Sequence, residues 1–140
     1  MSEHGKVFLD TNILVYSQDG HSRSKQRRAR TLLRDVQDGG NGVISTQVLQ
    51  EFFVTATRKL EIDPIVAKGM LHSLNALELV TVDADLIGEA ADCSILNLLS
   101  FRDALIVVSA ERAHCAELWT EDLNDGQQIR GVHVRNPFTA

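Results

Sequence analysis

The stretch VFLDTNILVY, residues 7–16, decides how the rest of the chain is interpreted. Its apolar start, Val7-Phe8-Leu9, is typical of a short buried strand, and the apolar residues after Asn12 indicate a short helix. Asp10 stands between these two elements. Such a carboxylate either caps the helix that follows it or serves as a ligand. The two roles are compatible, because the N–H groups at a helix N-terminus also orient a carboxylate for binding.

The composition is that of an ordinary globular protein. The chain has 140 residues, of which 44% are hydrophobic and 24% charged, so we expect a single domain over residues 1–140 with a real core. No apolar run reaches the roughly 18 residues of a membrane span, and MSEHGKVFLD lacks the pattern of a signal peptide. We therefore expect a cytoplasmic protein without membrane contact, in which Cys93 and Cys115 are buried free thiols.

Short apolar segments alternate with amphipathic ones along the whole chain. Strands are predicted at 6–9, 43–45, 78–82 and 117–120, with an edge strand at 131–134, and helices at 11–17, 21–39, 46–60, 64–77, 84–98 and 102–113. Thr46 is the predicted N-cap of the third helix. The alternation predicts an α/β three-layer sandwich with a mostly parallel central sheet of four to five strands. Ligands of such sheets bind beyond the carboxyl ends of the strands, where Asp10 and Asp122 are expected.

Three further acids have ordinary local explanations. Asp103 completes a capping box that begins at Ser100, which is the S-x-x-D pattern ahead of an apolar helix. Glu51 lies off the apolar face of its helix, where a solvated side chain is the usual outcome, and Asp122 fits an ordinary loop. Composition and spacing alone leave open whether these acids and Asp10 converge.

Four stretches, in order along the chain, resemble the PIN-domain ribonucleases, and specifically the VapC-type toxins of toxin–antitoxin pairs. FLDTNILVY carries Asp10 and Asn12, STQVLQEFF carries Glu51, LLSFRDALIVVSAE carries Asp103, and LWTEDLNDGQ, with VRNPF after it, carries Thr120 and Asp122. The resemblance covers residues 6 to 138, almost the whole chain. It implies that the four acids form one acidic pocket at the carboxyl ends of the strands.

Such a pocket needs a cation. Two carboxylates about 4 Å apart repel each other by ~4 kcal/mol at an effective dielectric constant of about 20. Ligands that are all oxygen select a hard ion, so the resemblance implies Mg²⁺ or Mn²⁺. We expect Asp10 and Asp103 to bind the ion directly. Glu51 and Asp122 would act through water or at a second ion, and the number of ions stays open.

The implied activity is that of an endoribonuclease that hydrolyses RNA with metal-activated water. Glu51 or Asp122 would orient that water or accept its proton, while Asn12 and Thr120 would hold the carboxylates in place. The RNA products should carry a 5′-phosphate and a 3′-hydroxyl. The resemblance also implies a VapB-type antitoxin as partner and a homodimer. The sequence names neither the RNA target, nor the antitoxin class, nor the dimer surface.

Two arginine features of this acidic chain could affect the site or its partners: Arg102 and a group of arginines between residues 23 and 34. Arg102 stands where family members often have an aromatic or another uncharged residue; it could pair with Asp103 and compete with the metal, or point outward to RNA phosphate. Six of the 14 basic residues fall between Arg23 and Arg34, although the net charge is −5. A stripe along one helix face is formed by Arg23, Arg27, Arg30 and Arg34. This stripe is either a solvated face or a contact surface for RNA phosphate or the antitoxin.

Other functions begin from the same first acid. A phosphatase of the haloacid-dehalogenase type also has an Asp after its first strand, but it uses D-x-D, and this chain has Asn12 at the second position. A receiver-like binding module would need a phosphoacceptor Asp on a middle strand and a late Lys, and neither is evident. A PIN fold without catalysis is the third alternative.

Overall fold

In residues 5–139, which the computed structural model describes, six strands form one sheet. The strands are β1 (Val7–Leu9), β2 (Gly42–Ser45), β3 (Glu78–Val80), β4 (Glu117–Trp119), β5 (Gln128–Ile129) and β6 (Val132–Arg135). Their order across the sheet is β3-β2-β1-β4-β6-β5, and only the β5–β6 pair is antiparallel. The chain runs outward from β1 in both directions, so β1 and β4 flank the point where the strand order reverses. Ligands of open α/β sheets bind at such a point.

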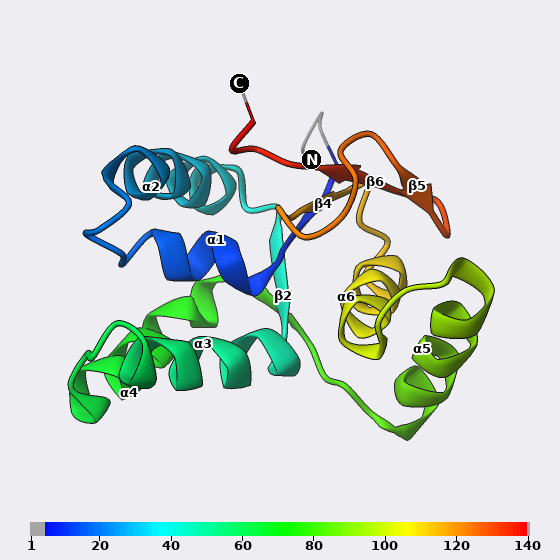
Figure 1. Cartoon of the computed structure of the whole chain (residues 1–140), viewed down its shortest axis with the longest axis horizontal. Coiled ribbons are helices and arrows are strands. Elements are labelled where there is room, and N and C mark those ends of the chain that lie inside the picture. The colour runs from blue at the N-terminus through cyan, green and yellow to red at the C-terminus, as the bar shows by residue number, and fades with distance from the viewer. Residues whose placement is uncertain (1–4, 140) are drawn as a thin grey trace.

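Helices cover both faces of the sheet and give the predicted three layers. They are α1 (Thr11–Tyr16), α2 (Arg23–Gly39), α3 (Thr46–Arg58), α4 (Pro64–Ser73), the 3₁₀ turn η1 (Leu74–Ala76), α5 (Ala84–Asn97) and α6 (Phe101–Arg112). Figure 1 shows α1 to α4 on one side of the strands and the packed pair α5 and α6 on the other. The mixed α/β fold with a mostly parallel central sheet is therefore confirmed.

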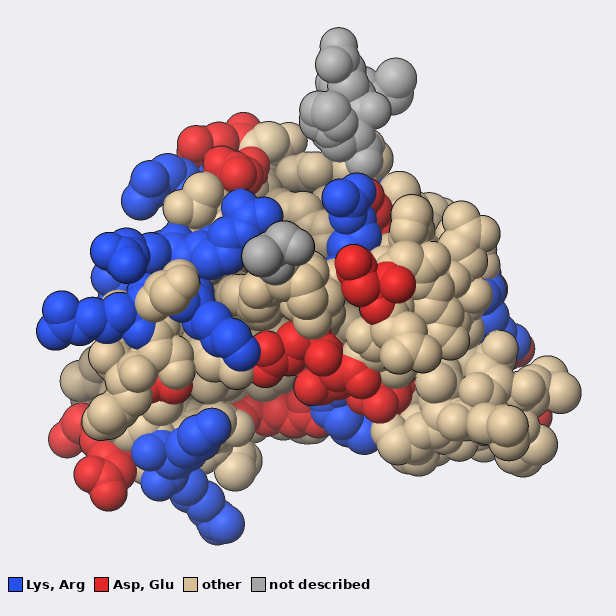
Figure 2. All heavy atoms as spheres, turned by 45° about the horizontal axis from the view of Figure 1, so that its top comes forward, with Lys and Arg blue, Asp and Glu red and all other residues tan. Residues whose placement is uncertain are grey.

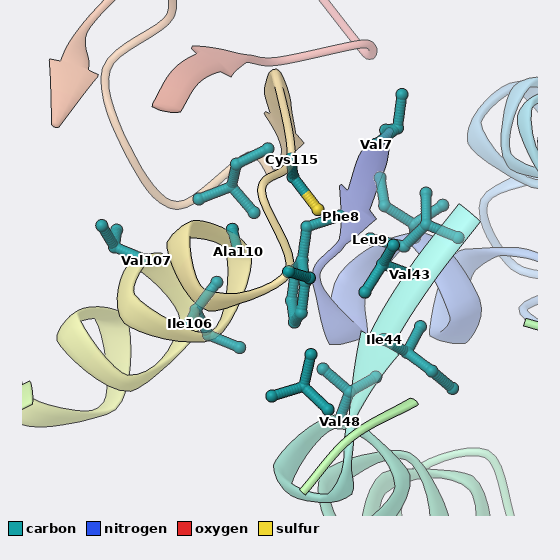
Figure 3. Close-up of a cluster of buried hydrophobic side chains, with 14 of the residues drawn as sticks. Val7, Phe8, Leu9, Val43, Ile44, Val48, Ile106, Val107, Ala110 and Cys115 are labelled. Atoms are coloured by element: carbon teal, nitrogen blue, oxygen red, sulfur yellow. The ribbon is translucent and has the colours of Figure 1, made fainter. Parts of the chain in front are cut away.

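The core lies between α6, the central strands and the helices on the opposite face. Phe8, Leu9, Ile44 and Leu118 are at most 1% exposed, as expected for parallel strands that are buried on both faces. In Figure 3, Phe8 lies on the α6 side of the sheet, toward Ile106. Each fully buried side chain of this size contributes roughly 1.5–3 kcal/mol to folding. The core thus fixes β1, which Asp10 directly follows, and α6, which carries Asp103.

One predicted helix N-cap and one predicted strand position are wrong. The N-cap of α3 is Ser45, whose hydroxyl accepts a hydrogen bond from Val48 N, whereas the Thr46 hydroxyl accepts from Val82 N. The strand at 132–135 is not at the edge of the sheet, because the two-residue strand β5 pairs with it. A tight turn joins them at Arg130 and Gly131, which both have positive φ angles, 51° and 81°, as a type I′ hairpin turn requires.

Two smaller expectations concern the thiols and the membrane. Cys93 and Cys115 are buried and free, as predicted. In the described residues no single helix is long and apolar enough to cross a membrane; α5 and α6 reach that length only as a pair bent by 115°.

Candidate active site

Asp10 is the most deeply buried of the four predicted acids. It follows β1 directly and is the N-cap of α1, where its Oδ1 accepts a 2.6 Å hydrogen bond from Thr11 N. Its Oδ2 accepts a 2.8 Å bond from the hydroxyl of Thr120. The side chain is only 2% exposed. The predicted capping role and the predicted site role therefore belong to the same carboxylate, which the fold holds in one orientation.

Thr120 connects Asp10 to the loop that carries Asp122. Besides donating to Asp10, its Oγ1 accepts a hydrogen bond from Asp122 N at 3.0 Å and one from Asn12 Nδ2 at 3.4 Å. Asn12 Nδ2 also donates to Asp122 Oδ2 at 3.3 Å. Asn12 and Thr120 thus contact the carboxylates, as the resemblance implied.

The Glu51 carboxylate reaches the same place from α3. Its Oε1 accepts a 2.6 Å hydrogen bond from the Thr11 hydroxyl, and its Oε2 accepts a 3.2 Å bond from Gln47 Nε2. Glu51 is half-buried rather than solvated, so the local expectation for this residue was wrong. Its helix begins at the carboxyl end of β2, next to β1 in the sheet, and this brings Glu51 beside Asp10 although 41 positions separate them in the sequence.

Asp103 comes from the first turn of α6. Ser100 is the N-cap of this helix, and its hydroxyl accepts a 3.1 Å hydrogen bond from Asp103 N, which is one half of the predicted capping box. The Asp103 carboxylate, 20% exposed, points to the same cluster as the other three acids. The four acids that the family pattern named therefore come together, each from a different part of the chain.

The guanidinium of Arg102 contacts all four carboxylates. Nη2 donates to Asp10 Oδ1 at 2.6 Å and to Glu51 Oε1 at 2.7 Å, while Nε donates to Glu51 Oε2 at 3.1 Å. Nη1 lies 3.0 Å from Asp103 Oδ1, 3.2 Å from Asp10 Oδ2 and 3.5 Å from Asp122 Oδ2. Of the two alternatives for Arg102, pairing with the acids is the one that the structure contains.

The cation and the acids shift one another's proton affinity. Burial lowers the pKa of Arg102, but hydrogen bonds to Asp10 and Glu51 outweigh it and raise the pKa above its ordinary value. Burial raises the pKa of Glu51, yet hydrogen bonds from Arg102 and Thr11 bring it below its ordinary value. For Asp122, burial and the charge of Asp10 raise the pKa, and the more distant Arg102 only partly opposes this. Of Glu51 and Asp122, Asp122 is the acid more ready to accept a proton.

A groove of about 520 Å³ opens beside the acids. It is lined by Glu51, Arg102 and Asp122 on the one hand and by the apolar side chains of Val15 and Val54 on the other. A polymer chain that lies in this groove would therefore pass the acid cluster. Figure 2 shows a band of Asp and Glu side chains across the middle of one face, with Lys and Arg gathered toward the side that carries α2.

The four members of the arginine stripe, Arg23, Arg27, Arg30 and Arg34, are all exposed, opposite the buried face of α2. Arg23 and Arg27 border one shallow hollow. Arg30 differs, because its Nε donates a 2.8 Å hydrogen bond to Ser17 O and so ties α2 to the end of α1. The geometry of the stripe is as predicted, and its partner stays a prediction.

Sequence reasoning missed three groups at the site. Gln47 donates to Glu51 and to Arg102 O, and its spacing of one helical turn before Glu51 would have indicated it. Thr11 adjoins Asp10 in the sequence, but the pattern at this position indicates only the first residue of a helix; the N–H and hydroxyl of Thr11 donate to Asp10 and Glu51. The third group anchors the loop next to Asp122: Glu121 accepts hydrogen bonds from Tyr16 O–H at 2.6 Å and from Lys25 Nζ at 3.0 Å.

The donor set fits a hard divalent cation. All four groups are carboxylates, which Mg²⁺ and Mn²⁺ prefer, and one positive group already reaches every one of them. Within residues 5–139, no three His, Cys, Asp or Glu side chains are arranged to ligate one ion directly. The guanidinium of Arg102 lies between the four carboxylates, so the acids are arranged around this cation and not around a metal ion.

Comparison with known proteins bears on both the fold and the site. The PIN domain family model matches residues 7–126, a span that includes all four acids. None of the curated protein sequences matches this chain.

Solved structures share the fold over nearly the whole chain. A toxin–antitoxin complex from Klebsiella pneumoniae aligns with a TM-score of 0.70 at 22% identity, covering 96% of this chain and 100% of that one. The sarcin–ricin loop cleaving toxin VapC20 of Mycobacterium tuberculosis aligns with a TM-score of 0.69 at 20% identity, covering 84% and 92%. DNA-bound VapBC from Salmonella typhimurium gives 0.69 at 17% identity, covering 95% and 98%.

Proposed function

Because the chain belongs to the PIN domain family, we propose that it is a Mg²⁺- or Mn²⁺-dependent endoribonuclease, a VapC-type toxin that hydrolyses RNA phosphodiester bonds. The observation that carries this proposal is the convergence of four carboxylates beside a groove, those of Asp10, Glu51, Asp103 and Asp122. They surround one positive group, the guanidinium of Arg102. A catalyst of phosphodiester hydrolysis needs positive charge beside the scissile phosphate and a group that removes a proton from water.

The surroundings of each acid suggest a different catalytic role for it. Asp10 and Asp103 are the proposed direct ligands of the ion, since Asp10 is held rigidly by Thr11 N and the Thr120 hydroxyl. A bound divalent ion supplies charge stabilisation at the phosphate and lowers the pKa of water. Asp122 is the better proton acceptor, because its pKa is raised and its side chain is 46% exposed toward solvent. Glu51, fixed by Thr11 and Gln47, would orient the attacking water.

We further propose a partner and a setting for this activity. A VapB-type antitoxin holds the enzyme inactive, which agrees with the toxin–antitoxin complexes among the solved structures of the same fold. RNA as the substrate agrees with the neighbour described as cleaving the sarcin–ricin loop. The enzyme would act in the cytoplasm as a homodimer. The family match favours this assignment over a haloacid-dehalogenase-type phosphatase and over a receiver-like module.

An RNA cleavage assay tests the proposal and separates it from a PIN fold without catalysis. The purified protein, free of antitoxin, is incubated with total RNA in Mg²⁺, in Mn²⁺ and in EDTA, and Asp10→Asn is tested beside it. We expect cleavage with either metal, none in EDTA, and a loss of roughly 100-fold or more in Asp10→Asn. Cleavage in EDTA, or full activity of Asp10→Asn, would refute the assignment.

A further inference from the structure

Arg102 binds the acid cluster through two forks. Nη2 and Nη1 donate to Oδ1 and Oδ2 of Asp10 at 2.6 and 3.2 Å, and Nη2 and Nε donate to Oε1 and Oε2 of Glu51 at 2.7 and 3.1 Å. Two-point pairs of this kind are the strongest hydrogen bonds between an arginine and a carboxylate. Both oxygens of Asp10 and both oxygens of Glu51 are therefore engaged by the same side chain.

A metal ion at these acids would need the same oxygens. The guanidinium and a divalent ion are both positive, so they repel each other at the few ångströms that separate groups sharing a carboxylate. Apart from Arg102, few groups donate hydrogen bonds to these two carboxylates. Asp10 accepts from Thr11 N and the Thr120 hydroxyl, and Glu51 accepts from the Thr11 hydroxyl and Gln47 Nε2. Occupation by the ion and occupation by the Arg102 guanidinium are thus alternatives.

The Arg102 side chain has room to leave the acid cluster. It is 34% exposed and lines the groove beside the acids, so a rotation of its flexible stem would place the guanidinium in the groove. The backbone of Arg102 stays in place, because its carbonyl accepts a hydrogen bond from Gln47 and it belongs to the first turn of α6. In the groove the same fork matches the geometry of a phosphate.

We propose that Arg102 is an internal competitor for the metal site: in the metal-free protein its guanidinium neutralises the acid cluster, and a divalent ion binds only as this guanidinium leaves for the groove. This inference rests on the proposed metal dependence and goes beyond it, since it assigns to one residue of this chain the control of metal affinity. The wild-type protein then binds metal more weakly than its four carboxylates alone would.

Metal affinity without RNA tests the inference. Mn²⁺ binding is measured by calorimetry and by the electron paramagnetic resonance of free Mn²⁺, for the wild type, Arg102→Gln and Arg102→Lys. We expect Arg102→Gln to bind Mn²⁺ roughly tenfold or more tightly than the wild type, and Arg102→Lys to lie between them, because a lysine keeps the charge but cannot form the forks. Equal affinity of the wild type and Arg102→Gln would overturn the inference.

Arg112→Gln is the matched control. Arg112 lies on the same helix, has a similarly exposed side chain, 37% against 34%, and pairs with Asp83 away from the acid cluster. The substitution removes the same charge, and we expect unchanged Mn²⁺ affinity. An equal gain in Arg112→Gln and Arg102→Gln would trace the effect to net charge alone and overturn the inference.

A measurement on the wild type covers the case in which Arg102→Gln does not fold without metal. The Nε–H signal of Arg102 is followed by nuclear magnetic resonance during a Mg²⁺ titration, with that of Arg112 as reference. We expect the Arg102 signal alone to shift and to exchange faster with water. A Mg²⁺ titration that moves the signals around Asp10 but leaves Arg102 unchanged would contradict the inference.

The outcomes also separate this inference from the proposed function. If the wild type cleaves RNA only with metal, but Arg102→Gln binds Mn²⁺ no more tightly, the inference fails and the nuclease assignment stands. If none of the variants binds Mn²⁺ and none cleaves RNA, both fail.

Discussion

The hydroxyl of Thr120 donates a 2.8 Å hydrogen bond to Oδ2 of Asp10, and both residues are buried, at 0% and 1% exposure. The same hydroxyl accepts the backbone N–H of Asp122. One oxygen atom therefore joins the acid after β1 to the acid after β4, across the point where the strand order of the sheet reverses.

Thr120→Val tests this relationship, because valine has nearly the same shape and no hydroxyl. We expect the free energy of unfolding to fall by about 1–3 kcal/mol, the usual cost of leaving a buried acceptor of a charged group without its donor. RNA cleavage should fall as well, since both Asp10 and the loop of Asp122 lose a fixed position.

Thr120→Ser is the control for that substitution. It keeps the hydroxyl and should retain most of the stability and activity. Urea denaturation and the RNA cleavage assay measure both quantities, and a Thr120→Val protein indistinguishable from Thr120→Ser would show that the hydroxyl matters little.

The local features of the site follow from the sequence, including a possible Arg102–Asp103 pair, but the contacts of Arg102 with Asp10 and Glu51 do not. The cap at Asp10 and the Ser100–Asp103 pattern involve residues within a few positions of each other, so short patterns predict them. Arg102 instead meets Asp10 and Glu51 over 92 and 51 positions. That contact depends on α6 beginning opposite the carboxyl ends of β1 and β2, which only the packed sheet determines.

The error at the last strands has a comparable origin. Strand β5 has only two residues, Gln128 and Ile129, too few to produce a periodic pattern. The turn after it is Arg130-Gly131, without the Asn or Asp that usually marks a type I′ turn. The pairing of so short a strand can be recognised only in the structure, and this is why the strand predicted at 131–134 was expected at the edge.

Asp83 gives the fold a pH dependence that lies away from the acid cluster. Its Oδ1 accepts hydrogen bonds from Leu86 N and from Arg112 Nη1, both at 2.9 Å, and these bonds hold its pKa below the ordinary 3.8. A lowered pKa in the folded state means that the contribution to stability is complete above pH 3.8 and is lost as the pH falls through the folded value.

Asp83→Asn keeps the capping oxygen and removes the titration. The wild type should therefore be the more stable protein above pH 3.8, and its advantage should shrink below that pH. Urea denaturation of both proteins at a series of pH values measures the difference. A difference that does not change with pH would contradict the assignment.

The arginine stripe on α2 should contribute to binding through charge. Arg23 and Arg27 are the members to substitute, because Arg30 also holds the end of α1 through Ser17 O. We expect Arg23→Ala with Arg27→Ala to weaken binding of RNA or antitoxin and to reduce the slope of log affinity against log salt by roughly one to two.

The control for the stripe removes the same charge from other parts of the surface, with Lys68→Ala and Arg112→Ala. This variant should keep the salt slope of the wild type. If the two double variants bind RNA and antitoxin alike across the salt series, the stripe is an ordinary solvated face.

The chemistry of the cut ends tests the central claim most directly, namely that four carboxylates and a divalent ion activate water against an RNA phosphodiester. A short RNA is cleaved by the purified protein with Mn²⁺, and the product ends are identified by mass spectrometry. Attack by water makes no use of the RNA 2′-hydroxyl as nucleophile, so we predict a 5′-phosphate and a 3′-hydroxyl. Products that end in a 2′,3′-cyclic phosphate would contradict the account.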